Sequence, residues 1–453
     1  MSRLDMKDAV YHFARDHGGS RDQFALLVFD SVDAPAPTFA DVLAHVESRS
    51  PRIPGLGVRL RETLWGLDYP RWVRDDSPPR DHVVDHDLTE PSWDGVEAFI
   101  GELLSTRLDM RTLAWKLHVI RGARDAPLVQ GAATLIVLQV GHALTDGSGV
   151  TRLLRALFVP HGDPTIDTPL PGHTSPDSTV RTALGVARGI LFAPVDLAIS
   201  RWEASRSLRA VLRTAMPPLL PASSLNRAVG SSRAVRIVPL SAGEVRAVNS
   251  TVTVSALAAV GSSLRRYLSA VDSSGGRDEL GIAAMVPMAL PPDCAWPSAN
   301  RVVVGTVNLH VGIDNPEERP KHIARSLDRE RTRVTGEPAL RLARADERVP
   351  APIVQFVQGR RFRRRIRNPE HVAGQTTVVS VNRGGADLEL CGATARFTAG
   401  FPFLDDGRAL THGFFGLGDT VTVATVTCPE VMPSLGPYTQ DLVDELRGRP
   451  NPG

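Results

Sequence analysis

A histidine and an aspartate stand four residues apart in the segment 140–149, which reads Val-Gly-His-Ala-Leu-Thr-Asp-Gly-Ser-Gly. His142 could act as a general base near neutral pH, because an unperturbed imidazole has a pKa of about 6.5. The pattern H-x-x-x-D-G is loose when taken alone. On these residues alone, a histidine that is simply hydrogen-bonded in the core at the end of a strand is an equally good interpretation.

The elements on either side of this segment would hold it at the edge of a core. Residues 132–140 form a continuous apolar run, which is typical of a strand buried on both faces. The residues after it predict a helix, whose apolar face would contain Val150, Leu153, Leu154 and Leu157. Asp146 would cap that helix, a contribution of about 1 kcal/mol. Gly147 and Gly149 would supply backbone freedom, so a side chain at either position should displace His142.

A chain of 453 residues is longer than the roughly 250–300 residues that one core usually serves. The sequence predicts an α/β (α+β) layered fold with an N-terminal domain at 1–175, a helical linker at 176–230 and a C-terminal domain at 231–453. The linker helix should be interrupted near Pro194. The pattern of apolar residues predicts strands near 24–30, 115–120, 132–140, 234–240, 281–288, 302–313, 376–381 and 420–426, and helices near 39–46, 92–104, 179–213, 254–268, 317–333 and 436–447.

Composition argues against several classes of protein. The formal net charge of +2 does not favour nucleic acid as a partner, and we expect none. Cys294, Cys391 and Cys428 show no metal-ligand spacing, so we expect no metal site and a reducing, cytoplasmic location. The first residues lack the apolar core of a signal peptide, and no window approaches the ~18 apolar residues of a spanning helix.

Further segments, in order along the chain, share a resemblance to one family. They are Ser2–Asp5, Tyr69–Val73, Asp81–Val83, Leu108–Arg111, Trp115–Ile120, Val286–Met288, Ala299–Asn300, Ser380–Asn382 and Phe401–Pro402. Together with H-x-x-x-D-G, they resemble the bacterial wax ester synthase/diacylglycerol acyltransferase family. This family lies within the chloramphenicol-acetyltransferase-like superfamily of CoA-dependent acyltransferases. The resemblance runs from near residue 1 to about residue 447.

The resemblance implies two similarly folded, chloramphenicol-acetyltransferase-like halves with a substrate channel between them. It implies that His142 is the base for direct acyl transfer from a fatty acyl-CoA to a long-chain alcohol or a diacylglycerol, without a covalent intermediate. Acyl-CoA would be a substrate, and no cofactor is expected. The resemblance also implies that Asp146 pairs with an arginine and holds the loop; a helix cap is an equally weighted role for it.

The sequence departs from the family at three places. Gly141 stands where the family has the first of two histidines, and Thr253-Val254 stands where it has Asn-Asp. Residues 380–385 read Ser-Val-Asn-Arg-Gly-Gly where the family has S-N-V-P-G-P. The candidates for substrate or oxyanion binding are therefore Ser380, Asn382 and Thr253. Two alternatives stay open: an acyltransferase for a specialised lipid or natural-product hydroxyl, and a non-catalytic lipid-binding relative.

A cluster of basic residues at 359–367 contains Arg363, Arg364 and Arg365. It could bind the phosphates of CoA, or attach the protein peripherally to the inner membrane face or a lipid droplet, at about 1 kcal/mol per basic residue. A solvated charged surface explains the cluster equally well.

Overall fold

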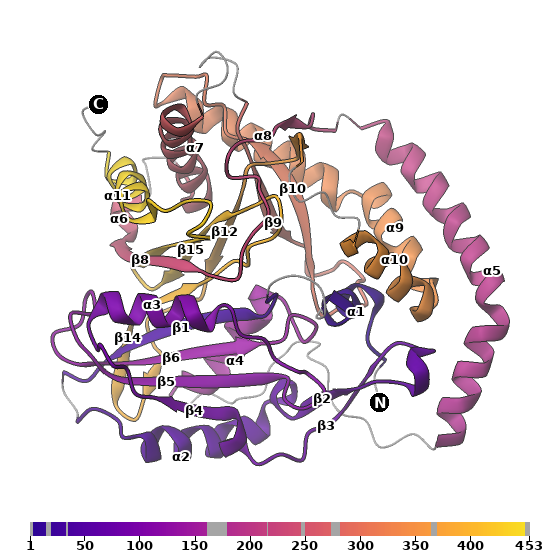
Figure 1. Cartoon of the computed structure of the whole chain (residues 1–453), viewed down its shortest axis with the longest axis horizontal. Coiled ribbons are helices and arrows are strands. Elements are labelled where there is room, and N and C mark those ends of the chain that lie inside the picture. The colour runs from indigo at the N-terminus through magenta and orange to yellow at the C-terminus, as the bar shows by residue number, and fades with distance from the viewer. Residues whose placement is uncertain are drawn as a thin grey trace.

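The computed structural model describes residues 3–14, 20–32, 35–160, 179–214, 216–245, 250–272, 281–363 and 369–448. In this part of the chain, helices surround two six-stranded sheets, one in each half of the molecule (Figure 1). The mixed α/β class that the sequence predicts is therefore confirmed.

The N-terminal sheet has the strand order β13-β14-β1-β6-β5-β4. Its strands are β1 (Gln23–Asp30), β4 (Val83–His86), β5 (Trp115–Ala123), β6 (Ala133–Val140), β13 (Glu389–Leu390) and β14 (Ala393–Gly400). Every residue of β6 is buried, as its continuous apolar sequence predicts. One face of the sheet packs against α2 (Phe39–Arg49) and α4 (Gly147–Phe158), and the other packs against α3 (Trp93–Leu103) and the second sheet.

The spatial halves do not follow the expected boundary at residue 231. Strands β13 and β14 belong to the C-terminal part of the sequence, yet β14 pairs antiparallel with β1 of the N-terminal sheet, with Val28 opposite Phe397. Without β14, the backbone groups along one side of β1 would lack partners in the sheet. The two halves are therefore joined by shared strands as well as by a buried apolar cluster that contains residues of both sheets.

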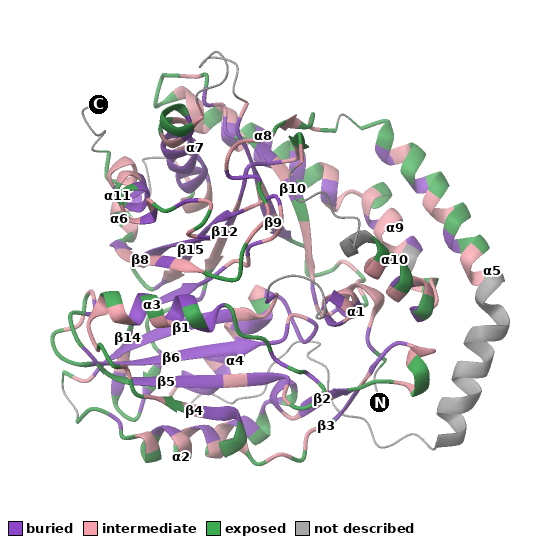
Figure 2. Ribbon diagram, viewed as in Figure 1, coloured by how far each residue is buried: buried purple, intermediate pink, exposed green. Residues whose placement is uncertain are grey.

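The C-terminal sheet has the strand order β10-β9-β12-β15-β16-β8. Its strands are β8 (Ala234–Ser241), β9 (Ala283–Ala289), β10 (Val302–Asn308), β12 (Thr376–Asn382), β15 (Leu410–Leu417) and β16 (Thr420–Thr427). Strand β12 runs parallel to β9 and β15. Helices α7 (Val252–Val271), α8 (Glu318–Thr335) and α11 (Leu435–Leu446) cover this sheet, and their apolar residues form its core (Figure 2).

The remaining elements lie around the two sheets. They are α1 (Met6–Phe13), α5 (Thr179–Leu212), α6 (Ala242–Val245), α9 (Glu337–Ala345), α10 (Ala351–Arg363), the pairs β2 (Val58–Arg61)/β3 (Arg71–Arg74) and β7 (Leu220–Pro221)/β11 (His371–Val372), and short 3-10 turns. Helix α5 runs along the outer edge of the molecule (Figure 1) and continues through Pro194, so the expected interruption is wrong. A proline removes one backbone donor, and a long helix can tolerate that loss. No helix among the described residues is long and apolar enough to cross a membrane.

Candidate active site

The loop between β6 and α4 is held by the carboxylate of Asp146, which acts as the N-cap of α4. Oδ1 accepts hydrogen bonds from the backbone N–H groups of Ser148 and Gly149, both at 3.0 Å. Oδ2 accepts from the backbone N–H of Arg301, at 2.8 Å, in the C-terminal half. The guanidinium of Arg301 donates instead to the carbonyls of Pro291, Pro292 and Cys294, so among the described residues Asp146 forms no ion pair with an arginine, and its role as a helix cap is the one observed.

The three glycines of this loop differ in what their positions require. A Cβ at Gly149 would lie 1.6 Å from Thr145 Oγ1, so the close packing of the loop on α4 demands glycine there. A Cβ at Gly147 would meet nothing closer than 3.9 Å, so our expectation that Gly147 is sterically required is wrong. A Cβ at Gly141 would lie 2.3 Å from Met110 Sδ. A second histidine at 141 would therefore need the side chain of Met110 to move.

The imidazole of His142 is partly buried, and one of its faces is stacked against another ring. It stacks on the ring of Tyr11 in α1, with the ring centres 3.9 Å apart and the planes 3° from parallel. Phe403 approaches as the perpendicular partner, with 6.1 Å between ring centres. Nδ1 is buried and makes no hydrogen bond to any residue that the structure describes. Burial lowers the pKa of His142 below its usual value, which favours the neutral form that a base requires at pH 7.

The backbone of His142 is held by a hydrogen-bond network that reaches α1. Asn300 Nδ2 donates to the carbonyl oxygen of His142 at 2.8 Å and to Asp8 Oδ1 at 2.7 Å. The carboxylate of Asp8 also accepts from the hydroxyl of Ser298 and from the backbone N–H groups of Ala299 (3.0 Å) and Asn300 (3.3 Å). Burial of Asp8 raises its pKa to about 6. The segment Ser298–Arg301 therefore links the histidine loop to α1 from the C-terminal half.

The sequence did not predict a role for Asp8 or Tyr11. Asn300 was identified only as part of a segment that resembles the family, without a role of its own. One signal for Asp8 was available, because α1 is amphipathic and Asp8 lies beside Ala9 and His12 on its buried face. A carboxylate in such a place needs donors from another segment. The identity of those donors depends on a contact nearly 300 residues away in sequence.

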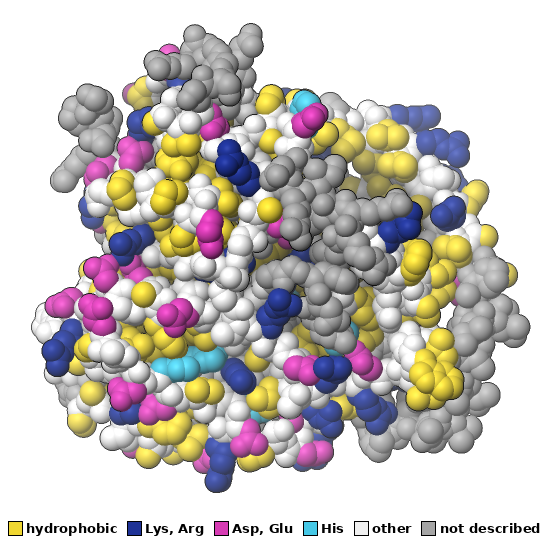
Figure 3. Space-filling view, in the orientation of Figure 1, with side chains coloured by type: hydrophobic (Ala, Val, Ile, Leu, Met, Phe, Trp, Pro, Cys, Tyr) yellow, Lys and Arg dark blue, Asp and Glu magenta, His cyan; other side chains and the backbone are white. Residues whose placement is uncertain are grey.

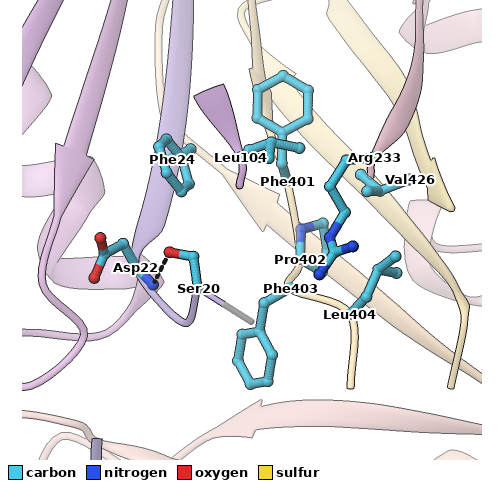
Figure 4. A pocket seen from close by; sticks show the side chains of 10 residues that line it. All are labelled: Ser20, Asp22, Phe24, Leu104, Arg233, Phe401, Pro402, Phe403, Leu404 and Val426. Atoms are coloured by element: carbon cyan, nitrogen blue, oxygen red, sulfur yellow. Dashed lines mark hydrogen bonds between the residues drawn. The ribbon is translucent and has the colours of Figure 1, made fainter. Parts of the chain in front are cut away.

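A pocket opens beside His142, with an empty volume of about 360 Å³ that includes solvent at its mouth. Its lining residues are Tyr11, Ala14, Arg21, Asp22, Arg107, Leu108, Met110 and His142. A neighbouring pocket of about 250 Å³ lies between the two halves, and Asp22 lines both. Figure 4 shows Phe24 and Leu104 on its N-terminal side and Arg233 and Phe401–Leu404 on its C-terminal side. The two pockets are therefore neighbours on either side of Asp22.

The match to family models decides the family. Residues 8–256 match the wax ester synthase/diacylglycerol acyltransferase catalytic domain, and residues 298–448 match the C-terminal domain of the same family. The chain belongs to this family. The first match begins at Asp8, whereas our sequence comparison placed the family's opening aspartate at Asp5, which caps α1.

Two relatives from Mycobacterium tuberculosis H37Rv are provisionally named diacylglycerol O-acyltransferases. One is 30% identical over 237 residues, which are 50% of this chain and 50% of the relative, so this match spans about half of that protein's length. The other is 23% identical over 457 residues, covering 96% of this chain and 87% of the relative.

Solved structures show the same fold. The wax ester synthase/diacylglycerol acyltransferase from Marinobacter aquaeolei VT8 superposes with a TM-score of 0.65 at 19% identity, covering 98% of each chain. The starter condensation domain of rhizomide synthetase, crystallised with C8-CoA, gives a TM-score of 0.57 at 12% identity, covering 98% of this chain and 94% of that chain.

Residues 380–385, which resemble the family's S-N-V-P-G-P pattern, begin on β12. The alternation of side chains along this strand decides which of them can approach α4. Val381 faces the histidine loop, since its Cγ2 lies 3.9 Å from the position of a Cβ on Gly147. Ser380 and Asn382 flank Val381 and therefore point to the opposite face of the sheet. Asn382 is exposed, and its Oδ1 accepts from the backbone N–H of Gly384.

The other candidate residues are not brought to the pocket by any described contact. Thr253 is partly buried and lies in the first turn of α7. Of the described residues, those lining the His142 pocket do not include Ser380, Asn382 or Thr253. Arg364 and Arg365 lie outside the described residues, and Arg363 is described only as the last residue of α10. In the described part of the chain, no cluster of His, Cys, Asp and Glu side chains could hold a metal ion.

A chain of polar side chains crosses the N-terminal sheet and ends at the pocket. Gln139 Nε2 donates to Asp22 Oδ2 at 2.8 Å, so the amide oxygen faces His118 and accepts from its Nε2 at 3.0 Å. His118 Nδ1 in turn accepts from His86 Nε2 at 2.9 Å. Burial lowers the pKa of His118 to about 4 and raises that of Asp22 to about 6. The N–H groups of His86, His118 and Gln139 therefore all point along this chain towards Asp22, whose carboxylate borders both pockets.

Proposed function

We propose that this chain is an acyl-CoA-dependent O-acyltransferase that transfers a fatty acyl group to a long-chain alcohol or a diacylglycerol, giving a wax ester or a triacylglycerol. The observation that carries the proposal is the placement of His142. Its imidazole lines a pocket near the junction of the two halves, and burial favours its neutral form. Membership of the family and the names of the mycobacterial relatives support the same chemistry.

In the proposed mechanism, Nε2 of His142 is the nitrogen that reaches the substrates, because Nδ1 is buried in the loop. Nε2 removes the proton of the acceptor hydroxyl as its oxygen attacks the thioester carbonyl. The tetrahedral intermediate then expels CoA, and the imidazolium returns the proton to the thiolate. Acid–base catalysis of this kind contributes ~10²–10⁴-fold, and the positioning of two substrates contributes much of the remainder. Arg363–Arg365 remain candidates for binding the phosphates of CoA.

A second candidate is an acyltransferase whose acceptor is a specialised, polar hydroxyl compound. The lining of the His142 pocket favours it, because Arg21, Asp22 and Arg107 stand beside the apolar Leu108 and Met110. A lining that combines charged and apolar side chains suits an acceptor that carries polar groups as well as an apolar body.

We also propose that the protein takes lipid substrates from a membrane or droplet surface. Trp65, Phe356 and Trp202 are 85%, 62% and 61% exposed, and they come from three neighbouring elements. The turn that carries Trp65 contacts α10 through the bond from Gln355 to the Gly66 carbonyl. The ion pair of Arg348 with Glu203 joins the segment before α10 to α5. Hydrophobic and basic side chains are interspersed on this side of the molecule (Figure 3), which suits an anionic lipid surface.

The lipid-surface proposal is tested by cosedimentation with vesicles of phosphatidylcholine and phosphatidylglycerol. Trp65→Ser should weaken binding several-fold, whereas Leu128→Ser, which removes another exposed hydrophobic residue (56%), should not. Equal binding by both variants and the wild type would remove this surface from consideration.

The catalytic proposal is tested by the release of free thiol from palmitoyl-CoA with hexadecanol, dioleoylglycerol or no acceptor. His142→Ala should lower acceptor-dependent release by ~10²–10⁴-fold while the protein stays folded. His310→Ala is the matched control, since it removes another partly buried histidine, one that contacts Ser326. Folded wild-type protein that releases no thiol with either acceptor would contradict the proposal for these substrates.

A further inference from the structure

Arg383 is a buried arginine that follows directly after β12. Its side chain reaches from the C-terminal half towards α4, and the residue is only 3% exposed. Nη1 donates to the hydroxyl of Thr151 at 3.2 Å, and the guanidinium carbon lies 5.1 Å from the centre of the Phe415 ring. In the S-N-V-P-G-P pattern that residues 380–385 resemble, a proline stands at this position.

The guanidinium of Arg383 has no ion-pair partner among the residues that the structure describes. Nε is buried without an acceptor, and Nη2 makes no hydrogen bond to the described residues. Within the described ranges, no carboxylate pairs with Arg383; the nearby Asp387 is bound by Arg155 at 2.7 Å. Burial lowers the pKa of Arg383 to about 9, so the group still carries its charge at pH 7.

This arrangement is costly for a protein that binds nothing here. Burial of an unpaired ion costs several kcal/mol even after the structure relaxes. A cation–π contact returns about 2 kcal/mol at best, and a neutral hydroxyl acceptor returns about as much. An anion bound between Nε and Nη2 would supply the missing partner, because the planar guanidinium fits phosphate and carboxylate groups in a bidentate manner.

Two hydrogen bonds connect Arg383 to the histidine loop. The Thr151 hydroxyl that accepts from Arg383 donates in turn to the carbonyl of Gly147 at 3.0 Å. Val381, two residues before Arg383, faces Gly147 directly. A group bound at Arg383 would therefore lie against the beginning of α4, close to the place of acyl transfer.

We propose that Arg383 binds an anionic group, a phosphate or a carboxylate, of a substrate that lies between α4 and the end of β12. This inference rests on the proposed acyl transfer for the identity of the substrate. The charge has two possible sources: the phosphates of CoA or an anionic acceptor. The acceptor is the better candidate, because the S-N-V-P-G-P pattern that residues 380–385 resemble has a proline at this position, so the CoA binding that the resemblance implies does not call for an arginine here.

The first experiment needs no turnover. Thermal unfolding of the full chain is followed with and without sodium phosphate, against chloride at equal ionic strength. Phosphate should raise the Tm of the wild type, and Arg383→Met should abolish the rise. Without phosphate, Arg383→Met should unfold at the wild-type temperature or above it, because it replaces an unpaired charge by an apolar chain of similar length. Arg396→Gln, which removes a guanidinium already paired with Asp30, should keep the response.

The second experiment compares two acceptors that differ by one charge, hexadecanol and 16-hydroxyhexadecanoate, in the palmitoyl-CoA assay. Arg383→Met should lower kcat/KM for the hydroxy acid at least about tenfold more than for hexadecanol. Such a difference assigns the anion to the acceptor. An equal rise in the KM for palmitoyl-CoA with both acceptors assigns it to CoA.

Two outcomes separate this inference from the proposed function. A phosphate response that depends on Arg383, in a protein without transferase activity, would support the anion site and contradict the function. Normal transfer with no phosphate response and no effect of Arg383→Met on either acceptor would overturn the anion site. A fall in the Tm of unliganded Arg383→Met, together with no phosphate response in the wild type, would show that the arginine is only structural.

Discussion

Two segments of the C-terminal half reach the histidine loop, and they use their polar groups in opposite ways. Ser298–Arg301 directs its donors to Asp8, His142 and Asp146. The end of β12 contributes Val381 and Arg383, and two guanidinium nitrogens of Arg383 have no acceptor in the described part of the chain. The first segment is a fixed support, whereas the second retains unused binding capacity. The donors that Ser298–Arg301 directs to the loop and to α1 are satisfied within the protein, although the buried Oδ1 of Asn300 has no partner among the described residues. What marks the end of β12 as a ligand site is an unsatisfied charged donor.

The largest effect is expected from Asp8→Ala, which tests whether Ser298–Arg301 is a structural support. This change removes the acceptor of four hydrogen bonds from residues 298–300. Ser298 and Asn300 keep other acceptors, whereas the N–H of Ala299 loses its acceptor altogether, so the free energy of unfolding should fall by about 2–4 kcal/mol. Urea denaturation measures the effect. Asp5→Ala, which removes only the N-cap of α1, should cost about 1 kcal/mol. If Asp8→Ala costs no more than Asp5→Ala, Ser298–Arg301 is not the support described here.

Asn300→Ala tests whether the support serves catalysis. It removes the bond to the His142 carbonyl, so kcat should fall about 10–100-fold because small displacements of a catalytic group are costly. The KM for palmitoyl-CoA should stay within about twofold, since positioning of the base is what changes. Asn308→Ala, at the end of β10, is the control. A change confined to KM would place Asn300 in substrate binding instead.

The smallest expected effect is a pH dependence of stability. Burial raises the pKa of Asp22 from 3.8 to about 6, so protonated Asp22 favours the folded state, and this stabilisation is lost as the pH rises through about 4 to 6. Asp22→Asn removes this dependence. From pH 4 to pH 7 the variant should gain about 1–2 kcal/mol on the wild type in urea denaturation. A constant difference across that range would show that the Asp22 carboxyl is not destabilised by burial.

Local patterns predicted the part of the site that is contiguous in sequence. The apolar run before His142 and the periodic apolar residues after it predicted β6, the loop and α4, because burial on both faces and helical periodicity leave direct traces in sequence. The Asp146 cap could be foreseen for the same reason. The sequence did not separate Gly147 from Gly149, since only packing shows that Thr145 fills the space at one of them.

Contacts between distant segments could not be predicted in this way. The bond of Asp8 to Asn300 and the pairing of β14 with β1 join residues nearly 300 or more apart, and no periodicity records them. On β12, the resemblance pointed to Ser380 and Asn382 because their residue types match those of the S-N-V-P-G-P pattern. Successive side chains of a strand alternate between its two faces, and on β12 the side chains that face α4 are those of Val381 and Arg383.

The pairing of β14 with β1 also has a consequence for how the protein is made. A ribosome must synthesise roughly 250 residues after β6 before β14 emerges, which takes on the order of 10–50 s. During that time, β1 is an open sheet edge with seven of its eight residues destined for burial. The N-terminal half should therefore depend on its own late-arriving strand, or on a chaperone, to avoid aggregation. Truncated chains that end before Ala393 should express as insoluble protein even though they contain the whole H-x-x-x-D-G loop.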